Sequence, residues 1–192
     1  MLDLLTLICW IAVYVLILCN YIFYPAEHSV SIPLLAVSMN IAWECNVMIA
    51  NGWMWGHVAW FFLDAGIFVF GLVKVWQKLI LNKICLGIYI VLSILLYQIF
   101  FDIFKIENGM LISSFTINLL MSLFFVIAFK KISTHFKTVI AAIKLVGTFA
   151  STIDYGMDFT PILIIGGAVF FVDLLYLSLS MEESLKLGKK RR

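Results

Sequence analysis

Four ionisable residues lie inside apolar stretches of this chain: Glu44, Asp64, Lys144 and Asp173. A charge at the centre of a membrane helix costs about 2.5–3.5 kcal/mol on the insertion scale, so such residues face a bundle interior or a cavity. A buried carboxyl keeps its proton because desolvation disfavours the charged form, and it can then act as a general acid. We therefore expect these residues to line one chamber within the membrane.

Polar and aromatic side chains extend this pattern along nearly every expected helix. Residues three or four positions apart share a helix face, and Asn40 lies one turn before Glu44. We expect the resulting strips to converge on the chamber. Their other members are Asn51, Trp60, Phe68, Tyr89, Ser93, Tyr97, Ser114, Asn118, Ser122, Thr148, Ser151, Thr152, Tyr155, Tyr176 and Ser180.

The polar residues also have a purely structural interpretation. Serine, threonine and asparagine in membrane helices commonly hydrogen-bond a neighbouring helix. Asp64 has a structural alternative of equal weight, in which its carboxyl is bonded to His57 or Trp60. Aromatic residues at the ends of spans are expected to be interface anchors. These are Trp10, Tyr24, Trp53, Trp55 and Trp76.

The three remaining ionisable residues each have a structural and a functional interpretation. Lys144 can equally well pair with Asp173 on the next helix or support a reaction. For Glu44 and Asp173 the functional interpretation is preferred, because carboxyls inside a membrane mark functional sites by default. These two carboxyls are therefore the candidate reactive groups.

Composition places the chain in a membrane. Of its 192 residues, 64% are hydrophobic and 12% are charged, and the mean hydropathy is +1.10. A soluble domain needs more polar surface, whereas apolar runs of about 20 residues match the thickness of a bilayer. We expect an all-α integral membrane protein that contacts lipid and binds no nucleic acid.

Hydropathy, with breaks at charges, proline and glycine, predicts seven transmembrane helices in a single domain, residues 1–192. The connections are short, so consecutive helices should pack antiparallel. The expected spans are 4–24, 31–50, 57–77, 84–101, 110–129, 138–157 and 161–181.

The basic residues predict an orientation. Of the 13 basic residues, three lie between spans three and four, three between spans five and six, and five after span seven. These segments share one side of the membrane, which the positive-inside rule makes cytoplasmic. The N-terminus is then outside and the C-terminus is in the cytoplasm.

Several familiar sites are missing from the sequence. The last span has no lysine for a retinal Schiff base, and no phosphate-binding glycine loop or Cys/His metal motif occurs. Asp154 and Asp158 lack a third acid, which makes a magnesium–diphosphate site a weak interpretation. We expect neither a metal nor another cofactor.

Four segments resemble one family of membrane enzymes. They are NYIFY at 20–24, IPLLAVSMNIAWE at 32–44, the K-x-x-G of Lys144 and Gly147, and AVFFVDLLYLSL at 168–179. They are similar to the integral-membrane terpene cyclases of fungal meroterpenoid and indole-diterpene biosynthesis, and to bacterial relatives that act on prenylated indoles. Lys144 stands where that family has an arginine.

The resemblance implies an activity and its residues. In that family, a glutamate of the second helix and an aspartate of the last are associated with activity, and they correspond to Glu44 and Asp173. The family cyclises prenyl chains by protonation and without a metal. We therefore expect a class II-like terpene cyclase, of isomerase or lyase type, acting on a lipophilic prenylated or epoxyprenylated molecule. The host membrane would be a bacterial inner membrane or the endoplasmic reticulum.

The expected mechanism assigns a role to each group. Glu44 donates the proton and Asp173 shares or relays it, although the two roles can be exchanged. Asn40, Asp64 and Lys144 support these acids. Aromatic faces stabilise the cation by about 2 kcal/mol or more when desolvated. The candidates are Trp43, Trp60, Tyr89, Tyr97, Phe171 and Tyr176.

Two alternatives remain open. Buried acids and a lysine also suit a small-molecule or proton-coupled transporter. Such carriers commonly have internal repeats and broken helices, whereas this sequence has no clear repeat and few glycine or proline breaks within its helices. A non-catalytic membrane subunit is the second alternative. The sequence predicts no oligomeric state.

Overall fold

Each of the seven expected spans coincides with a helix. The computed structural model describes residues 2–23, 34–75, 82–103, 105–131 and 136–190, and this part of the chain contains no strand. The helices are α1 (Leu2–Phe23), α2 (Leu34–Asn51), α3 (Trp55–Val75), α4 (Asn82–Ile103), α5 (Ile106–Ile127), α6 (Lys137–Gly156) and α7 (Thr160–Lys190), and a short 3-10 helix η2 (Phe129–Lys131) follows α5.

Five of these helices are long and apolar enough to cross a membrane, namely α1, α3, α5, α6 and α7. This is the pattern of a multi-pass membrane protein. Helix α2 has only 18 residues and contains Asn40, Glu44 and Asn46, which lower its hydropathy. Seven membrane crossings, and the orientation of the termini, therefore remain predictions.

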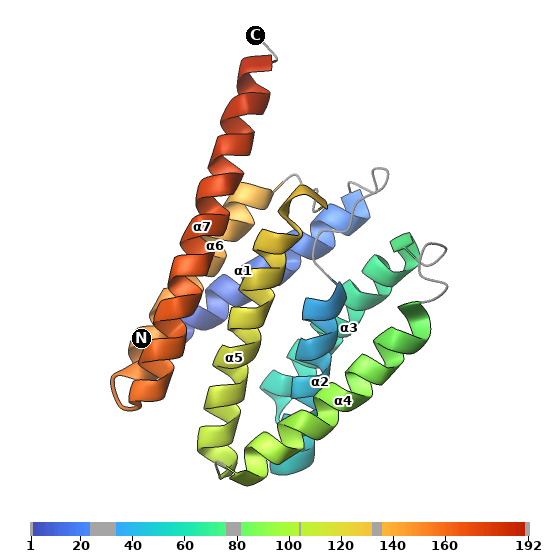
Figure 1. The fold of residues 1–192 in the computed structure, drawn as a ribbon, viewed down its shortest axis with the longest axis vertical. Coiled ribbons are helices and arrows are strands. Elements are labelled where there is room, and N and C mark those ends of the chain that lie inside the picture. The colour runs from blue at the N-terminus through green and yellow to red at the C-terminus, as the bar shows by residue number, and fades with distance from the viewer. Residues whose placement is uncertain (1, 24–33, 76–81, 104, 132–135, 191–192) are drawn as a thin grey trace.

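Helix α7 is longer than the sequence predicts. The expected span ends at residue 181, whereas the helix continues to Lys190 and projects beyond the rest of the bundle (Figure 1). Glu182 and Lys186 form an i,i+4 ion pair along this extension, and such pairs stabilise exposed helices. Glu183 also accepts a hydrogen bond of 2.8 Å from Lys137 at the start of α6. Polar residues end the apolar span here, but they do not end the helix.

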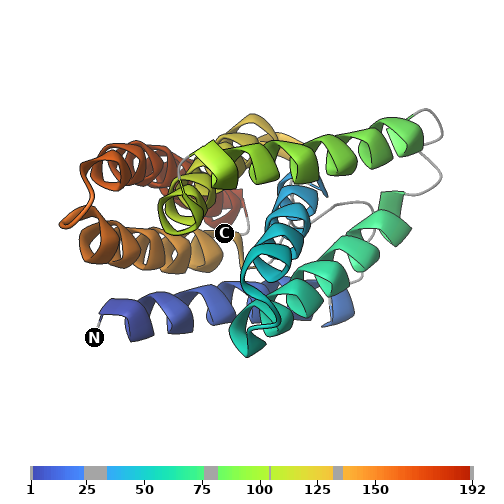
Figure 2. The same ribbon diagram turned by 90° about the horizontal axis from the view of Figure 1, so that it is seen from below.

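The helices form two groups that meet around α5. Helix α6 packs between α1 and α7, and α5 packs against α7. On the other side α2 contacts α3, α4 and α5, while α1 crosses behind the bundle from α6 to α3 (Figures 1 and 2). Helices α1, α2, α3, α5 and α6 supply the described residues that line a common cavity, whereas α4 and α7 supply none of them.

Two glycines allow the closest helix contacts. A Cβ on Gly147 of α6 would lie 2.9 Å from the Cβ of Cys9 on α1, and a Cβ on Gly166 of α7 would overlap the side chain of Thr152 on α6. Small residues commonly permit such approach in membrane bundles. The α1–α6–α7 group is therefore held at backbone distances that a larger residue would not allow.

Candidate functional site

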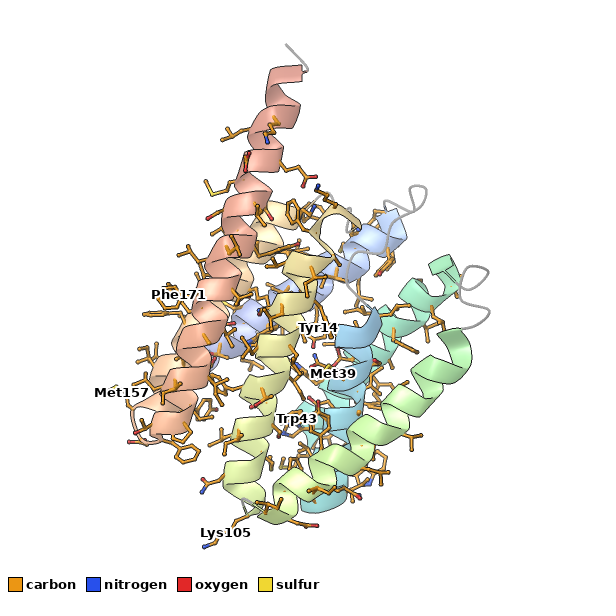
Figure 3. The ribbon with its side chains drawn as sticks, viewed as in Figure 1. Tyr14, Met39, Trp43, Lys105, Met157 and Phe171 are labelled. Carbon is orange, nitrogen blue, oxygen red and sulfur yellow. The ribbon has the colours of Figure 1, made fainter. Side chains whose placement is uncertain are left out.

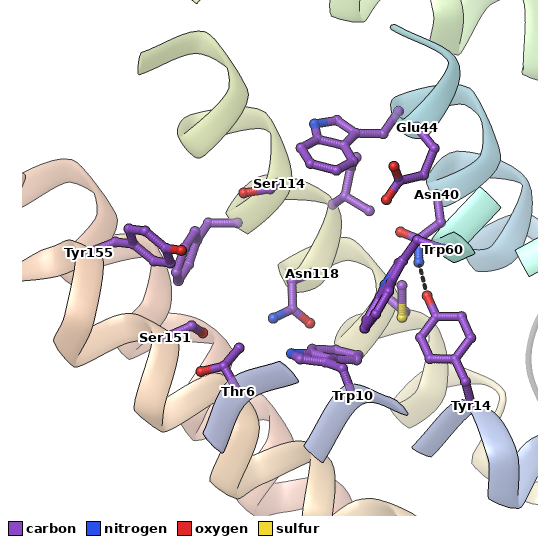
Figure 4. A pocket seen from close by; sticks show the side chains of 14 residues that line it. Thr6, Trp10, Tyr14, Asn40, Glu44, Trp60, Ser114, Asn118, Ser151 and Tyr155 are labelled. Carbon is purple, nitrogen blue, oxygen red and sulfur yellow. Dashed lines mark hydrogen bonds between the residues drawn. The ribbon is translucent and has the colours of Figure 1, made fainter. Parts of the chain in front are cut away.

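A cavity of about 200 Å³ lies at the centre of the five helices (Figure 4). We call it the Glu44 cavity. Its lining residues are Thr6, Trp10 and Tyr14 of α1; Asn40, Trp43 and Glu44 of α2; Trp60 of α3; Ser114, Phe115, Ile117, Asn118 and Met121 of α5; and Ser151 and Tyr155 of α6. The cavity therefore gathers members of the predicted strips of α2, α5 and α6 and one member of the α3 strip, Trp60, whereas Asp64 and Phe68 of that strip do not line it.

Helix α1 supplies a wall that the sequence prediction missed. Thr6, Trp10 and Tyr14 line the cavity at intervals of four residues, a spacing that puts them on one helix face. Trp10 was expected to be an interface anchor, and that expectation is wrong. Its ring is turned inward because Gly147 of α6 allows α1 to approach, with the Trp10 ring within 3.6 Å of a Cβ at that position. The four-residue spacing was the signal that could have revealed this wall.

Glu44 forms a hydrogen-bonded pair with His57. Nδ1 of His57 at the start of α3 lies 2.7 Å from Oε2 of Glu44. The side chain of Glu44 is 4% exposed, whereas that of His57 is 25% exposed. The sequence offered His57 as a partner of Asp64, but His57 pairs instead with the acid that lines the cavity.

Asp64 belongs to a second, more buried group. The amide of Asn40 donates to the Tyr14 hydroxyl at 2.9 Å, and the Tyr14 hydroxyl also forms a hydrogen bond with Asp64. Asp64 is 1% exposed, and its Oδ2 has no hydrogen-bond partner in the described part of the chain. Asn40 was predicted to support Glu44, but its amide nitrogen orients Tyr14, which holds the wall of the cavity against Asp64.

Lys144 and Asp173 form an ion pair outside the cavity. The Nζ of Lys144 lies 2.6 and 2.7 Å from the two carboxylate oxygens of Asp173, and 2.7 Å from Oγ of Ser122. Lys144 is 3% exposed and Asp173 is 2% exposed. The three contacts use the three N–H donors of the ammonium group, so this cluster joins α5, α6 and α7 with all its donors satisfied.

The position of this ion pair contradicts the expectation that the four ionisable residues share one chamber. Asp173, Asp64 and Lys144 do not line the cavity that Glu44 lines, so the prediction of one chamber shared by all four is wrong. Inside a bundle a lysine and an aspartate on adjacent helices neutralise each other, which lowers the free energy relative to either group alone. The structural alternative for Lys144 is the one observed. The pair lies close to the cavity wall, because the ring centroid of Trp10, which lines the cavity, is 5.6 Å from Nζ of Lys144.

Two of the aromatic residues that were predicted to stabilise the cation reach the cavity. Trp43 and Trp60 line the cavity; Trp43 donates from Nε1 to Oγ of Ser113 at 2.8 Å, and Trp60 packs against Tyr14 with ring centroids 5.6 Å apart. Both rings are therefore fixed by neighbours on other helices. Phe115 and Tyr155 are further aromatic lining residues that were not among the predicted cation-stabilising side chains.

The remaining aromatic predictions fail or lie outside the described residues. Phe171 is 71% exposed and points away from the bundle (Figure 3). Tyr176 and Tyr97 are buried in the core and do not line the cavity; Tyr176 packs against Phe125 with ring centroids 5.2 Å apart. The side chain of Tyr89 lies outside the residues that the structure describes.

The wall opposite Glu44 is polar but uncharged. Ser114, Ser151 and Tyr155 face Glu44 and Trp60 across the cavity (Figure 4). The hydroxyls of Ser114 and Ser151 donate to carbonyls of their own helices, which leaves oxygen lone pairs available. Asn118 donates to Oγ1 of Thr148 at 3.3 Å, and its Oδ1 has no partner among the described residues. The cavity therefore has one acid and several weak hydrogen-bond acceptors.

Among the residues that the structure describes, no three His, Cys, Asp or Glu side chains are grouped so that they could hold a metal ion. The arrangement is therefore described by its own acid–base groups, a carboxyl and an imidazole, and by its aromatic walls. Comparison with known protein families, with curated proteins and with solved structures found no match for this chain.

Proposed function

We propose that this chain is a membrane terpene cyclase that starts the cyclisation of a prenyl chain by proton donation from Glu44. One observation supports this above all others. A single buried carboxyl reaches a cavity whose neighbouring walls are the indole rings of Trp10, Trp43 and Trp60. Such a cavity combines a general acid with surfaces that stabilise a cation and do not react as strong nucleophiles.

The first step transfers the carboxyl proton of Glu44 to the oxygen of a terminal epoxide. The C–O bond to the more substituted carbon breaks, its electron pair stays on oxygen, and the oxygen becomes a hydroxyl. The next alkene of the chain then attacks the carbocation and forms a ring. Loss of a proton from the final cation gives an alkene, so the whole conversion is an isomerisation.

The aromatic walls suit the cation that moves during this sequence. A desolvated cation over an indole or phenol face gains about 2 kcal/mol or more. Trp43 and Trp60 are fixed by Ser113 and Tyr14, so they need no rearrangement as charge develops. Preorganised groups of this kind stabilise a transition state without a cost of reorganisation.

In this proposal Asp173 has a different role from the one that the resemblance of the chain to the terpene cyclase family implies. Its carboxylate is held by Lys144 at 2.6 and 2.7 Å and lies outside the Glu44 cavity. It therefore acts as a positioning residue. By fixing α6 against α7, the pair keeps Ser151 and Tyr155 of α6 in place as the far wall.

The cavity would hold the reacting end of a substrate. Its volume of about 200 Å³ is below the range of roughly 300–1,000 Å³ that encloses a drug-sized ligand. The remainder of a prenylated molecule would extend between helices into the lipid. A lipophilic substrate concentrated in the bilayer would reach the site from there.

The test uses an indole that carries a prenyl chain with a terminal epoxide, added to membranes that contain the protein. Glu44→Gln keeps the shape of the side chain and removes the acid, and we expect conversion to fall at least about 100-fold. Glu44→Asp retains an acid and should recover part of the rate. Glu182→Gln, at an exposed carboxyl on α7, is the matched control and should convert normally.

Two results would contradict the proposed function. Normal conversion by Glu44→Gln would rule out Glu44 as the proton donor. If the unaltered protein cyclises neither the epoxide nor the corresponding alkene, but carries protons or the probe across proteoliposome membranes, it is a carrier and the proposal is wrong.

A further inference from the structure

We infer that His57 returns a proton to Glu44 from the membrane surface, so that the acid is recharged after each turnover. This inference rests on the proposed function, because only an acid that gives away its proton needs to regain one. His57 acts through Glu44 and does not line the cavity, so it is a positioning and proton-delivering residue.

The geometry gives a direct link between the two groups. Nδ1 of His57 and Oε2 of Glu44 are 2.7 Å apart, which is the distance of a strong hydrogen bond. One partner lines the cavity and is 4% exposed, and the other is 25% exposed. A proton can therefore pass along an existing hydrogen bond from a group that is open to the surroundings to one that is not.

His57 lies near the start of α3, a candidate membrane span that begins at Trp55, so we expect it near the membrane surface. It is the third residue of α3 (Trp55–Val75). Because an α-helix rises 1.5 Å per residue, His57 lies about 3 Å along the helix from its first residue. Trp53 and Trp55 beside it are 82% and 87% exposed, and tryptophans of this kind mark the membrane–water interface. Glu44 lies seven residues before the end of α2, which corresponds to about 10 Å along the axis of α2.

No other described ionisable group offers the same route to Glu44. Around it, α1 presents Tyr14, α2 presents Cys45, α3 presents Asp64 and α6 presents Tyr155. Tyr14 and Asp64 are 5% and 1% exposed and are hydrogen-bonded to each other. Tyr155 is on the opposite wall, and a cysteine thiol is a weak proton donor. Of these described groups, His57 is the one that is both hydrogen-bonded to Glu44 and partly exposed.

A route of this kind balances the protons when the final proton leaves the substrate away from Glu44. After Glu44 protonates the epoxide, it is a carboxylate. The proton lost from the final cation leaves at a different carbon and passes through a hydroxyl or water at the opposite wall to bulk water. An imidazolium at His57 then transfers its Nδ1 proton to Glu44, and the neutral imidazole regains a proton from water at the surface. No net proton is consumed.

The experiment measures this proton transfer without a substrate. The C=O stretch of a protonated Glu44 is identified by infrared difference spectroscopy as the band that Glu44→Gln removes. Membranes are then moved from H₂O to D₂O, and the rate at which this band shifts reports proton exchange at Glu44. His57→Gln keeps a hydrogen bond to Glu44 but cannot relay a proton; His57→Ala leaves room for added imidazole.

We expect exchange at Glu44 to slow by about 100-fold in both variants, the lower end of the contribution of a proton-transferring side chain. Added imidazole should restore it in His57→Ala but not in His57→Gln. Trp55→Phe, next to the site and 87% exposed, is the control and should exchange as the unaltered protein does. A purely structural role for His57 would not produce rescue by imidazole.

Two results would overturn the inference: exchange in His57→Gln as fast as in the unaltered protein, or no Glu44 band at all. Turnover separates this failure from that of the proposed function. If Glu44→Gln is inactive while His57→Gln exchanges and turns over normally, Glu44 is the acid and His57 is not its proton source. If exchange depends on His57 but Glu44→Gln converts the epoxide normally, the relay exists and the proposed acid is wrong.

Discussion

The Glu44–His57 pair and the Lys144–Asp173 pair use similar groups in opposite ways. Both join two helices through contacts of 2.6–2.7 Å. In the first pair one member lines a cavity and its partner is 25% exposed. In the second both members are at most 3% exposed, and Ser122 completes the bonding of the lysine. A buried pair with all its donors satisfied suits helix packing, whereas a pair between a cavity and the surface suits proton transfer.

Breaking the buried pair should have the largest effect on stability. Lys144→Met leaves the Asp173 carboxylate buried without a partner, and we expect the free energy of unfolding to fall by about 3–5 kcal/mol. The double variant Lys144→Met/Asp173→Leu should recover most of this loss. Glu44→Gln should change stability by about 1 kcal/mol or less, since its partner is partly exposed. Denaturant titration in micelles measures all three.

The double variant also tests the division of roles. If it folds stably and still cyclises the epoxide probe, Asp173 is a positioning residue. A stable double variant without turnover would assign Asp173 a part in the chemistry, and the contrast between the two pairs would be lost.

The aromatic wall should have the next largest effect, on rate. Trp60→Leu removes one face that stabilises the cation, worth about 2 kcal/mol, which corresponds to about 30-fold in the rate constant. Phe171→Leu makes a similar aromatic-to-leucine change at a site that is 71% exposed and should leave the rate unchanged. Single-turnover kinetics with the epoxide probe compares them. Equal rates for both variants would show that Trp60 does not contact the cation.

Substitutions at two adjacent glycines of α7 test the close packing of α6 against α7, which brings Lys144 and Asp173 together. A Cβ at Gly166 overlaps Thr152, whereas a Cβ at Gly167 meets nothing within 4 Å. Overpacking costs typically 1–3 kcal/mol, and the better helix propensity of alanine returns up to about 1 kcal/mol. Gly166→Ala should therefore lower the free energy of unfolding by about 1–2 kcal/mol, while Gly167→Ala should be neutral or stabilising. The same loss at both positions would contradict the close α6–α7 contact.

The smallest effect is expected for the bond that holds Trp43. Trp43→Phe removes the hydrogen bond from Nε1 to Ser113, and such bonds between membrane helices average about 0.6 kcal/mol. Ser113→Ala should cost a similar amount, and the double variant should cost no more than either single variant. Additive losses in the denaturant titration would mean that the two side chains are not coupled.

The helices of this protein, and most of the residues that meet at its centre, could be predicted from the amino-acid sequence. Long apolar runs form helices because all backbone hydrogen bonds are then satisfied within one segment, and spacings of three and four predict a shared face. Glu44, Trp60, Ser114, Asn118 and Ser151 were therefore found from the sequence as members of converging strips, Trp43 was named as an aromatic wall, and all six line the cavity.

Which polar groups pair with one another could not be predicted from the sequence and depends on how the helices pack. Spacing along one helix says nothing about the rotation of the next helix or about how closely the two approach. Gly147 and Gly166 allow close contact, which turns Trp10 inward and brings α6 and α7 together, with Lys144 and Asp173 paired between them. That pairing removes Asp173 from the predicted chamber, and His57 becomes the partner of Glu44, because partner choice depends on contacts between residues far apart in the chain.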